Sequence, residues 1–187
     1  MTRKEFGIFV SALKTYYSRE KELLPTKETA ELWYRQLQDI PYKVAEAALN
    51  KWVATNKWSP SIADIRAMAV TITTGEKPLW SDGWEQVQRA IRKYGMYAIP
   101  EAMDSFTDEV TKKTVERLGF RELCMSENPM QDRANFRMIF EQLADRQEKE
   151  QQLPFTLTSL IEEIRRESIE SNVKRIGTEN AEKNEIL

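Results

Sequence analysis

The stretch NKWSPSIADIRAMA, residues 56–69, decides how the first half of the chain is interpreted. The two serines that flank Pro60 can cap a helix with their hydroxyl groups, and proline suits a first helical turn, where its missing N–H is not needed. Ile62 and Ile65 follow at helical spacing, which predicts a new helix with both side chains in the core. Trp58 precedes this helix, and the local pattern leaves open whether its side chain is buried or exposed.

Helical spacing of apolar residues extends upstream of this stretch. Thr2 and Glu5 have the spacing of a capping box, Thr26 can cap a second helix, and Pro41 begins a third. The residues expected to face the core of the four N-terminal helices are Phe6, Phe9, Val10, Leu13, Tyr16 and Tyr17, then Ala30, Trp33, Tyr34 and Leu37, then Val44, Ala45, Ala48, Leu49, Trp52 and Val53, and finally Ile62, Ile65, Ala69 and Ile72.

A segment rich in helix breakers, TTGEKP at residues 73–78, interrupts the periodicity and is the expected domain boundary. Beyond it, helices are expected to end at Gly95 and Gly119, because glycine suits the left-handed position after a helix. The longest helix should begin at Pro129. A last helix is expected over about Thr158–Ser171, followed by a polar, disordered tail.

These patterns predict an all-α fold, since no run of alternating Val, Ile or Thr with turn signals is present. We expect a small N-terminal four-helix domain over residues 1–74 and a second helical domain over residues 79–152. Residues 153–187 should form a C-terminal helix and a flexible tail.

The composition excludes several classes of enzyme. The chain has 187 residues, a formal net charge of −2 and no histidine, so catalysis and zinc binding that depend on histidine are excluded. Its six glycines are too scattered for a phosphate-binding loop. The sequence also lacks an apolar membrane span and a signal sequence. We therefore expect a cytoplasmic, non-enzymatic protein with no membrane contact and no catalytic, cofactor-binding or metal site.

Three possible chemical features have simpler structural interpretations. The acidic pairs Glu162–Glu163 and Asp145–Glu148 are typical of solvated helix faces. Cys124 has no histidine to activate it and is better interpreted as a small core residue. The five tryptophans and nearby cations could bind DNA, but a near-neutral chain lacks the electrostatic footprint of an autonomous DNA-binding protein.

Four arginines are candidates for contact with an acidic partner surface, because arginine favours two-pronged contacts with carboxylates. They lie on the two C-terminal helices and are Arg133, Arg137, Arg165 and Arg166. The simpler alternative is ion pairing within a helix, for example between Arg137 and Glu141. Trp58 can likewise be either a structural staple or an exposed contact.

The N-terminal part of the chain contains three characteristic segments, TRKEFGIFVSALKTYYS, ETAELWYRQLQDIPYKVAEAALNKW and NKWSPSIADIRAMA. Together they resemble the phage-encoded replicative helicase loader/inhibitor family. The later segments WEQVQRAIRKYG and RLGFRELCMSENPMQDRANFRMIFEQLADRQ are similar to an extension seen in longer phage replication proteins of this kind.

This resemblance implies a protein that binds a DnaB-type hexameric helicase, inhibits it while bound, and delivers it to single-stranded DNA at a phage origin. The expected location is the cytoplasm of a bacterial host, with an origin-binding protein as a further partner and only weak or indirect DNA contact. We further expect the helix over Thr158–Ser171 to dock in a groove of the helicase. The residues of this helix expected at the contact are Arg165, Arg166, Leu160, Ile161 and Ile164. The alternative is an accessory protein that binds origin DNA or single-stranded DNA through its N-terminal surface.

Overall fold

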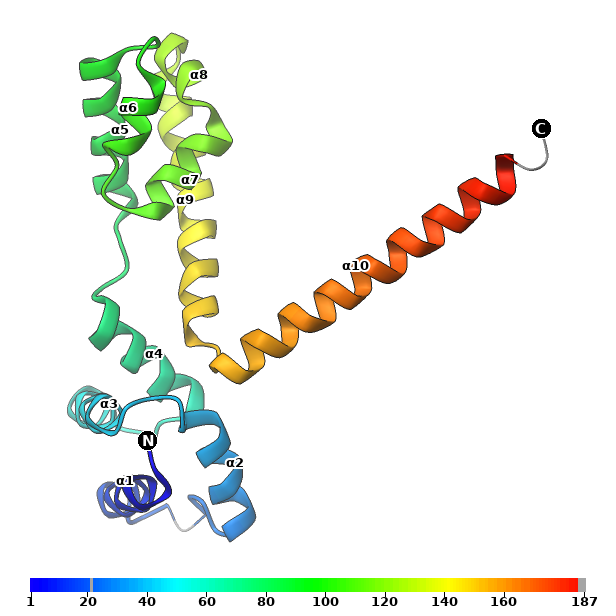
Figure 1. Ribbon diagram of the computed structural model, residues 1–187. Helices are drawn as coiled ribbons and strands as arrows, with labels where there is room; N and C mark the ends of the chain where they lie inside the picture. Colours follow the sequence, from blue (N-terminus) through cyan, green and yellow to red (C-terminus); the bar gives the residue numbers. More distant parts are fainter. Residues whose placement is uncertain (21, 185–187) are drawn as a thin grey trace. The chain divides into compact units, whose positions relative to one another are not determined.

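The computed structural model describes residues 1–20 and 22–184, with the backbone alone over residues 170–184. The described residues form helices and connections and contain no strand, which confirms the all-α fold (Figure 1). The helices are α1 (Arg3–Tyr16), α2 (Lys27–Leu37), α3 (Tyr42–Thr55), α4 (Ile62–Thr74), α5 (Trp80–Tyr94), α6 (Ile99–Asp104), α7 (Glu109–Leu118), α8 (Phe120–Met125), α9 (Pro129–Gln152) and α10 (Phe155–Asn184).

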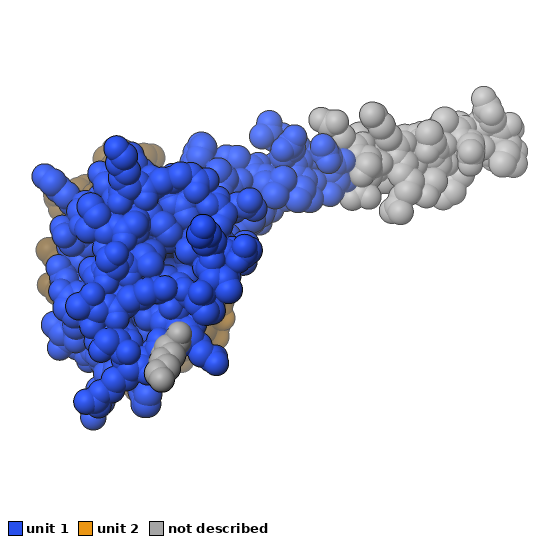
Figure 2. Space-filling view, turned by 90° about the horizontal axis from the view of Figure 1, so that it is seen from below, with its two compact units in different colours: residues 1–62, 153–187 blue, residues 63–152 orange. Residues whose placement is uncertain are grey.

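The chain divides into two compact units (Figure 2). Unit 1 contains residues 1–62 and 153–187, and unit 2 contains residues 63–152. The division therefore falls within the first turn of α4, whereas we expected a domain boundary at residues 73–78. Compactness alone does not define an independently folding domain, so the expected domains stay a prediction.

Unit 1 is built on a short helical core in which α1 packs against α3. Thr2 and Glu5 form the expected capping box, and Thr26 caps α2 by accepting a hydrogen bond from the N–H of Thr29. The buried apolar residues of its N-terminal segment are Phe6, Phe9, Leu13, Leu24, Leu37, Ile40, Ala45, Ala48 and Leu49. All but Leu24 and Ile40 belong to the stripes predicted from helical spacing.

The core of unit 2 lies where α5, α7 and α9 meet. Phe136 and Phe140, one turn apart on α9, are almost completely buried, and Trp84 packs with its ring centroid 5.3 Å from that of Phe136. Helices α5 and α7 end at Gly95 and Gly119, both at positive φ, as the sequence predicts.

Three expectations about the core and the last helix are wrong. Ile72 is 39% exposed and Tyr16 is 52% exposed, although both fall on the predicted stripes. The last helix begins at Phe155 and its backbone continues to Asn184, well past the expected end at Ser171. No proline interrupts residues 155–184, and a single internal glycine is not sufficient to end a helix. The final three positions of the expected tail lie outside the described residues.

Gly83 on α5 lies where side chains of α7 and α9 approach the backbone of α5 closely. A Cβ atom at this position would lie 2.6 Å from Thr111 Oγ1 and 2.9 Å from Phe140 Cε2, closer than such atoms can approach. Thr111 is fixed because its hydroxyl donates a hydrogen bond to Asp108 Oδ2 at 2.7 Å, and Phe140 is held in the core. Glycine is therefore required here by packing rather than by backbone conformation.

We predict that Gly83→Ala destabilises unit 2 by about 1–3 kcal/mol, because the clash outweighs the higher helix propensity of alanine. Gly7→Ala is the matched control, since nothing lies within 4 Å of a Cβ atom there. That variant should gain about 0.5–1 kcal/mol from helix propensity alone. Urea unfolding followed by circular dichroism measures both, and equal shifts of the same sign would contradict the packing role of Gly83.

Candidate partner-binding surfaces

The side chain of Trp58 is exposed, and hydrogen bonds hold the loop that carries it in unit 1. This side chain is 78% exposed, while the carbonyl oxygen of Trp58 accepts a hydrogen bond from Trp52 Nε1 at 2.8 Å. The next residue, Ser59, donates its hydroxyl proton to Glu20 Oε2 at 2.5 Å, and Pro60 is buried. The loop is thus anchored on both sides of Trp58, and its ring faces solvent rather than acting as a buried staple.

Ser59 consequently does not play the capping role that the sequence allows, because its hydroxyl is engaged by Glu20. Helix α3 ends with Asn56 as its C-cap, as expected, and the N–H of Asn56 donates a hydrogen bond to the carbonyl of Trp52 at 2.8 Å. Ile65 is fully buried, as predicted, whereas Ile62 is only half-buried. Within this stretch, Ile65 is therefore a core residue and the side chain of Trp58 is exposed to solvent.

Arg133 and Arg137 on α9 come together over one aromatic ring of unit 2. Their guanidinium carbons lie 5.1 and 5.2 Å from the ring centroid of Trp80, a cation–π arrangement. Arg137 also donates from Nε to Glu141 Oε1 at 2.8 Å, which is the intrahelical ion pair that the spacing allows. Both arginine side chains remain exposed, so the cluster combines a structural role with an available cationic surface.

The apolar residues of α10 form a stripe on one side of the helix. At 100° per residue, Leu157, Leu160, Ile161 and Ile164 fall within an arc of about 100°. Leu160 and Ile164 are 50% and 52% exposed, and Ile161 is half-buried. The structure therefore shows an apolar helix face that is largely open to solvent.

The two arginines of α10 differ in their relation to this stripe. Helical spacing places Arg165 about 40° from Ile161, at the edge of the stripe, and Arg166 on the opposite side of the helix. Both side chains are exposed. Arg165 can therefore accompany the apolar stripe into a binding groove, whereas Arg166 would face away from it.

The candidate residues do not form one site within either unit. Trp58 and the α10 residues belong to unit 1, and Arg133 and Arg137 belong to unit 2. The described residues contain no cluster of Cys, Asp and Glu that could hold a metal ion. Burial raises the pKa of the Cys124 thiol, which disfavours the nucleophilic thiolate, and the side chain packs against the core of unit 2.

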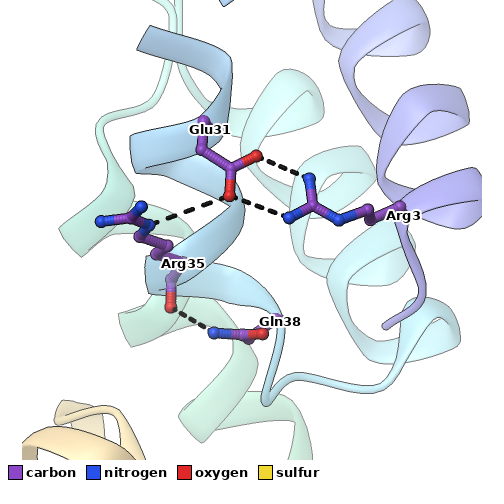
Figure 3. Close-up of polar contacts among 4 residues, drawn as sticks. All are labelled: Arg3, Glu31, Arg35 and Gln38. Atoms are coloured by element: carbon purple, nitrogen blue, oxygen red, sulfur yellow. Dashed lines mark hydrogen bonds and ion pairs between the residues drawn. The ribbon is translucent and has the colours of Figure 1, made fainter. Parts of the chain in front are cut away.

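A polar cluster that helical spacing does not predict joins α1 to α2 (Figure 3). The guanidinium of Arg3 donates to both carboxylate oxygens of Glu31, at 2.6 and 3.0 Å, and lies 4.6 Å from the ring centroid of Tyr34. Arg35 approaches the same carboxylate at 3.8 Å from the other side. The partners Arg3 and Glu31 are 28 residues apart, so no local spacing could have revealed the pair.

The chain's first residue is attached beside this cluster. The ammonium group of Met1 donates hydrogen bonds to the carbonyl oxygens of Gln38 and Ile40, the latter at 2.8 Å. Gln38 is the C-cap of α2, so one of these bonds satisfies a carbonyl group at the end of that helix, and the other satisfies a carbonyl in the connection that follows. The beginning of α1 is thus fixed to the end of α2, which supports the fold of the N-terminal segment.

Comparison with protein-family models finds a match over the N-terminal helices. Residues 1–66 match the model for the N-terminal domain of the gene 39 protein of phage SPP1. That protein is a helicase loader, so the match supports a relationship between this chain and a phage helicase loader family. The matched residues 1–66, called the loader-like region below, comprise α1 to α3 and the beginning of α4.

No curated protein and no solved structure matches the chain. The expected relationship of the later segments to an extension in phage replication proteins therefore stays a prediction. Every helix in the described part of the chain is too short or too polar to span a bilayer.

The contact between Arg3 and Glu31 in the loader-like region predicts a pH-dependent coupling. The hydrogen bond from Arg3 holds the pKa of the Glu31 carboxyl below its ordinary value of 4.5. Because the pKa of Glu31 is lower in the folded state than in the unfolded state, its ionised form stabilises the fold at pH values above the unfolded pKa. This stabilisation is lost as the pH falls through the pKa of the folded state.

A double-mutant cycle with Arg3→Gln and Glu31→Gln measures this coupling. We expect a favourable coupling energy at pH 7 that decreases as the pH is lowered through the folded pKa of Glu31, measured by urea unfolding at pH 7 and at an acidic pH where the chain stays folded. Added salt should reduce the coupling at pH 7, because the Arg3 side chain is exposed and that of Glu31 is partly exposed. A coupling of equal size at both pH values would contradict the ionic origin of the contact.

Proposed function

We propose that this chain is a phage replication protein that binds the replicative hexameric helicase, inhibits it while bound, and loads it onto DNA at the origin. It acts in the cytoplasm of a bacterial host and is not itself an enzyme. An origin-binding protein is a second partner, and contact with DNA is weak or indirect. The observation that carries this proposal is the match of residues 1–66 to the N-terminal domain of a phage helicase loader.

The exposed stripe on α10 supports a binding role and indicates a mode of contact. An amphipathic helix can place residues spaced by three or four positions into an apolar groove of its partner. Leu160, Ile161 and Ile164 have this spacing and are at least partly exposed. We assign these three side chains to a groove of the helicase, with Arg165 contacting a carboxylate at its edge.

Trp58 and the pair Arg133–Arg137 are proposed as additional contacts. Tryptophan and arginine are enriched among residues that contribute most of the energy at protein interfaces. Trp58 is presented on an anchored loop, so binding it costs little ordering of the backbone. The cation–π contacts with Trp80 similarly restrict Arg133 and Arg137 before any partner binds.

A loader of this kind must act without a nucleotide cycle of its own, because the sequence lacks a phosphate-binding loop. It can then change the state of the helicase ring only by binding one state more tightly than another. Inhibition and loading would both follow from this difference in affinity. The helicase supplies the nucleotide hydrolysis.

We predict that Ile164→Glu weakens binding to the DnaB-type helicase at least tenfold, because it places a charge in an apolar contact. Ile169→Glu is the matched control, since Ile169 is also exposed on α10 but lies about 140° away around the helix. Deletion of residues 154–187 should reduce binding at least as much. Co-elution and titration with purified helicase measure all three, and equal affinity of the two glutamate variants would contradict the assigned face.

The purified chain is expected to hydrolyse no ATP by itself and to lower the ATPase rate of the helicase in proportion to the complex formed. A coupled ATPase assay with and without helicase measures both quantities. The Ile164→Glu variant should inhibit only at higher concentration, with the same maximal inhibition. ATP turnover by the chain alone would overturn the proposed mechanism, while helicase binding without a change in its ATPase rate would overturn inhibition.

A further inference from the structure

The end of α5 carries a concentrated positive charge that the proposed helicase contacts do not use. No acidic residue occurs between Gln86 and Pro100, although the whole chain has more acidic than basic residues. Arg89, Arg92 and Lys93 fall within an arc of about 100° around the helix. All three side chains carry their charges at the surface, so this end of α5 presents a cationic face to solvent.

Part of this face lines a pocket between the last turns of α5 and the connection from α6 to α7. Arg89, Lys93 and Tyr94 line one side of the pocket, and Ser105 and Thr107 line the other, with no carboxylate in the lining. Its volume of about 230 Å³ is below the roughly 300–1,000 Å³ of typical small-molecule sites. The pocket is therefore better suited to one anionic group of a larger ligand.

The wall of the pocket is fixed by hydrogen bonds. Gln86 Oε1 accepts from the N–H and hydroxyl groups of Thr107, at 2.9 and 3.1 Å, and Gln86 Nε2 donates to Asp108 Oδ2 at 3.0 Å. Asp108 is also engaged by the N–H and hydroxyl of Thr111, both at 2.7 Å. The nearest carboxylate in this loop is thus committed to the cap of α7.

Aromatic side chains accompany the charges. Tyr97, which follows the end of α5, is 86% exposed, and the ammonium of Lys93 lies 4.8 Å from the ring centroid of Tyr94. Tyr97 follows Lys93 by four residues in the sequence. Single-strand-binding proteins combine exposed aromatic rings, on which bases stack, with a cationic surface that follows the backbone. An acidic peptide would use the cations but would leave Tyr97 without a role.

We propose that this surface, comprising Arg89, Arg92, Lys93, Tyr94 and Tyr97, binds single-stranded nucleic acid. Arg89 and Lys93 contact a phosphate at the pocket, and Tyr97 stacks on a neighbouring base. The ion pair between Arg89 and Glu85, at 3.6 Å, is exposed and is exchanged for the phosphate at little cost. With only three cations the affinity is modest and strongly salt-dependent, which agrees with a weak contact to DNA.

Fluorescence anisotropy with the full chain at low salt tests this proposal. The probe is labelled oligothymidylate of about 20 nucleotides, longer than the roughly 4–16 nucleotides that a single-strand-binding fold typically covers. Arg89→Gln/Lys93→Gln should weaken binding about tenfold or more. It should also reduce the slope of log affinity against log salt by about 1.4, because two phosphate contacts are lost.

The chain offers a closely matched control in Lys113→Gln/Arg117→Gln on α7. Lys113 has an exposed pair with Glu109 at 3.7 Å, as Arg89 has with Glu85, and the change in net charge is the same. This control should change affinity less than about twofold. Tyr97→Ala should weaken binding about tenfold, whereas Tyr97→Phe should retain it, because stacking requires the ring and not the hydroxyl group.

Four outcomes would overturn the proposal: no binding of oligothymidylate or oligouridylate by the wild-type chain, equal loss in both double variants, tighter binding to duplex DNA than to a single strand, or equal competition by polyglutamate. The last result would instead identify the surface as a site for acidic peptides. Because this surface is separate from the α10 stripe, its failure would leave helicase binding unaffected, and the reverse also holds.

Discussion

The close approach of α5 to α7 and α9 at Gly83 is the constraint on which unit 2 depends. The space left by the missing Cβ atom brings the hydroxyl of Thr111 and the rings of Phe136 and Phe140 against the backbone of α5. The two phenylalanine rings, with centroids 5.6 Å apart, then pack as one apolar layer with Trp84. Because α5 is fixed by this layer, its last turns and the loop bonded to Gln86 also keep their geometry.

Features of the fold that depend on local chemistry could be predicted from the sequence. Thr2 caps α1, Gly95 and Gly119 end their helices, and Phe6, Phe9 and Leu13 are buried, because spacing and capping act within a few residues. Expectations failed where distant parts of the chain decide the outcome. Helical spacing cannot reveal, for example, that Arg66 is only 7% exposed and that its Nε donates a hydrogen bond to the carbonyl of Gln152, 86 residues away.

The same distinction between local and long-range causes applies to the candidate binding surfaces. The stripe on α10 and the pair Arg137–Glu141 could be predicted because helical periodicity places their members on one face. The exposure of Trp58 could not, since it depends on the bonds that Trp52 and Glu20 make to the loop. The cationic end of α5 was not singled out, because basic residues are common in the last turn of any helix.

If the chain loads a helicase without hydrolysing ATP, as proposed, several modest contacts are more effective than one strong contact. Moving a ring from about 1:99 to 99:1 between two states requires about 5.5 kcal/mol of differential binding. A buried Leu or Ile contributes about 1.5–3 kcal/mol, but association and ordering of side chains offset part of this gain. A single three-residue stripe would therefore be marginal for the proposed role, whereas each further chain bound to a hexameric ring would add its own difference in affinity. A weak contact with single-stranded DNA on the same chain would raise the local concentration of DNA at the ring. Because the contact is weak, it would not retain the DNA, so the DNA could be delivered and then released.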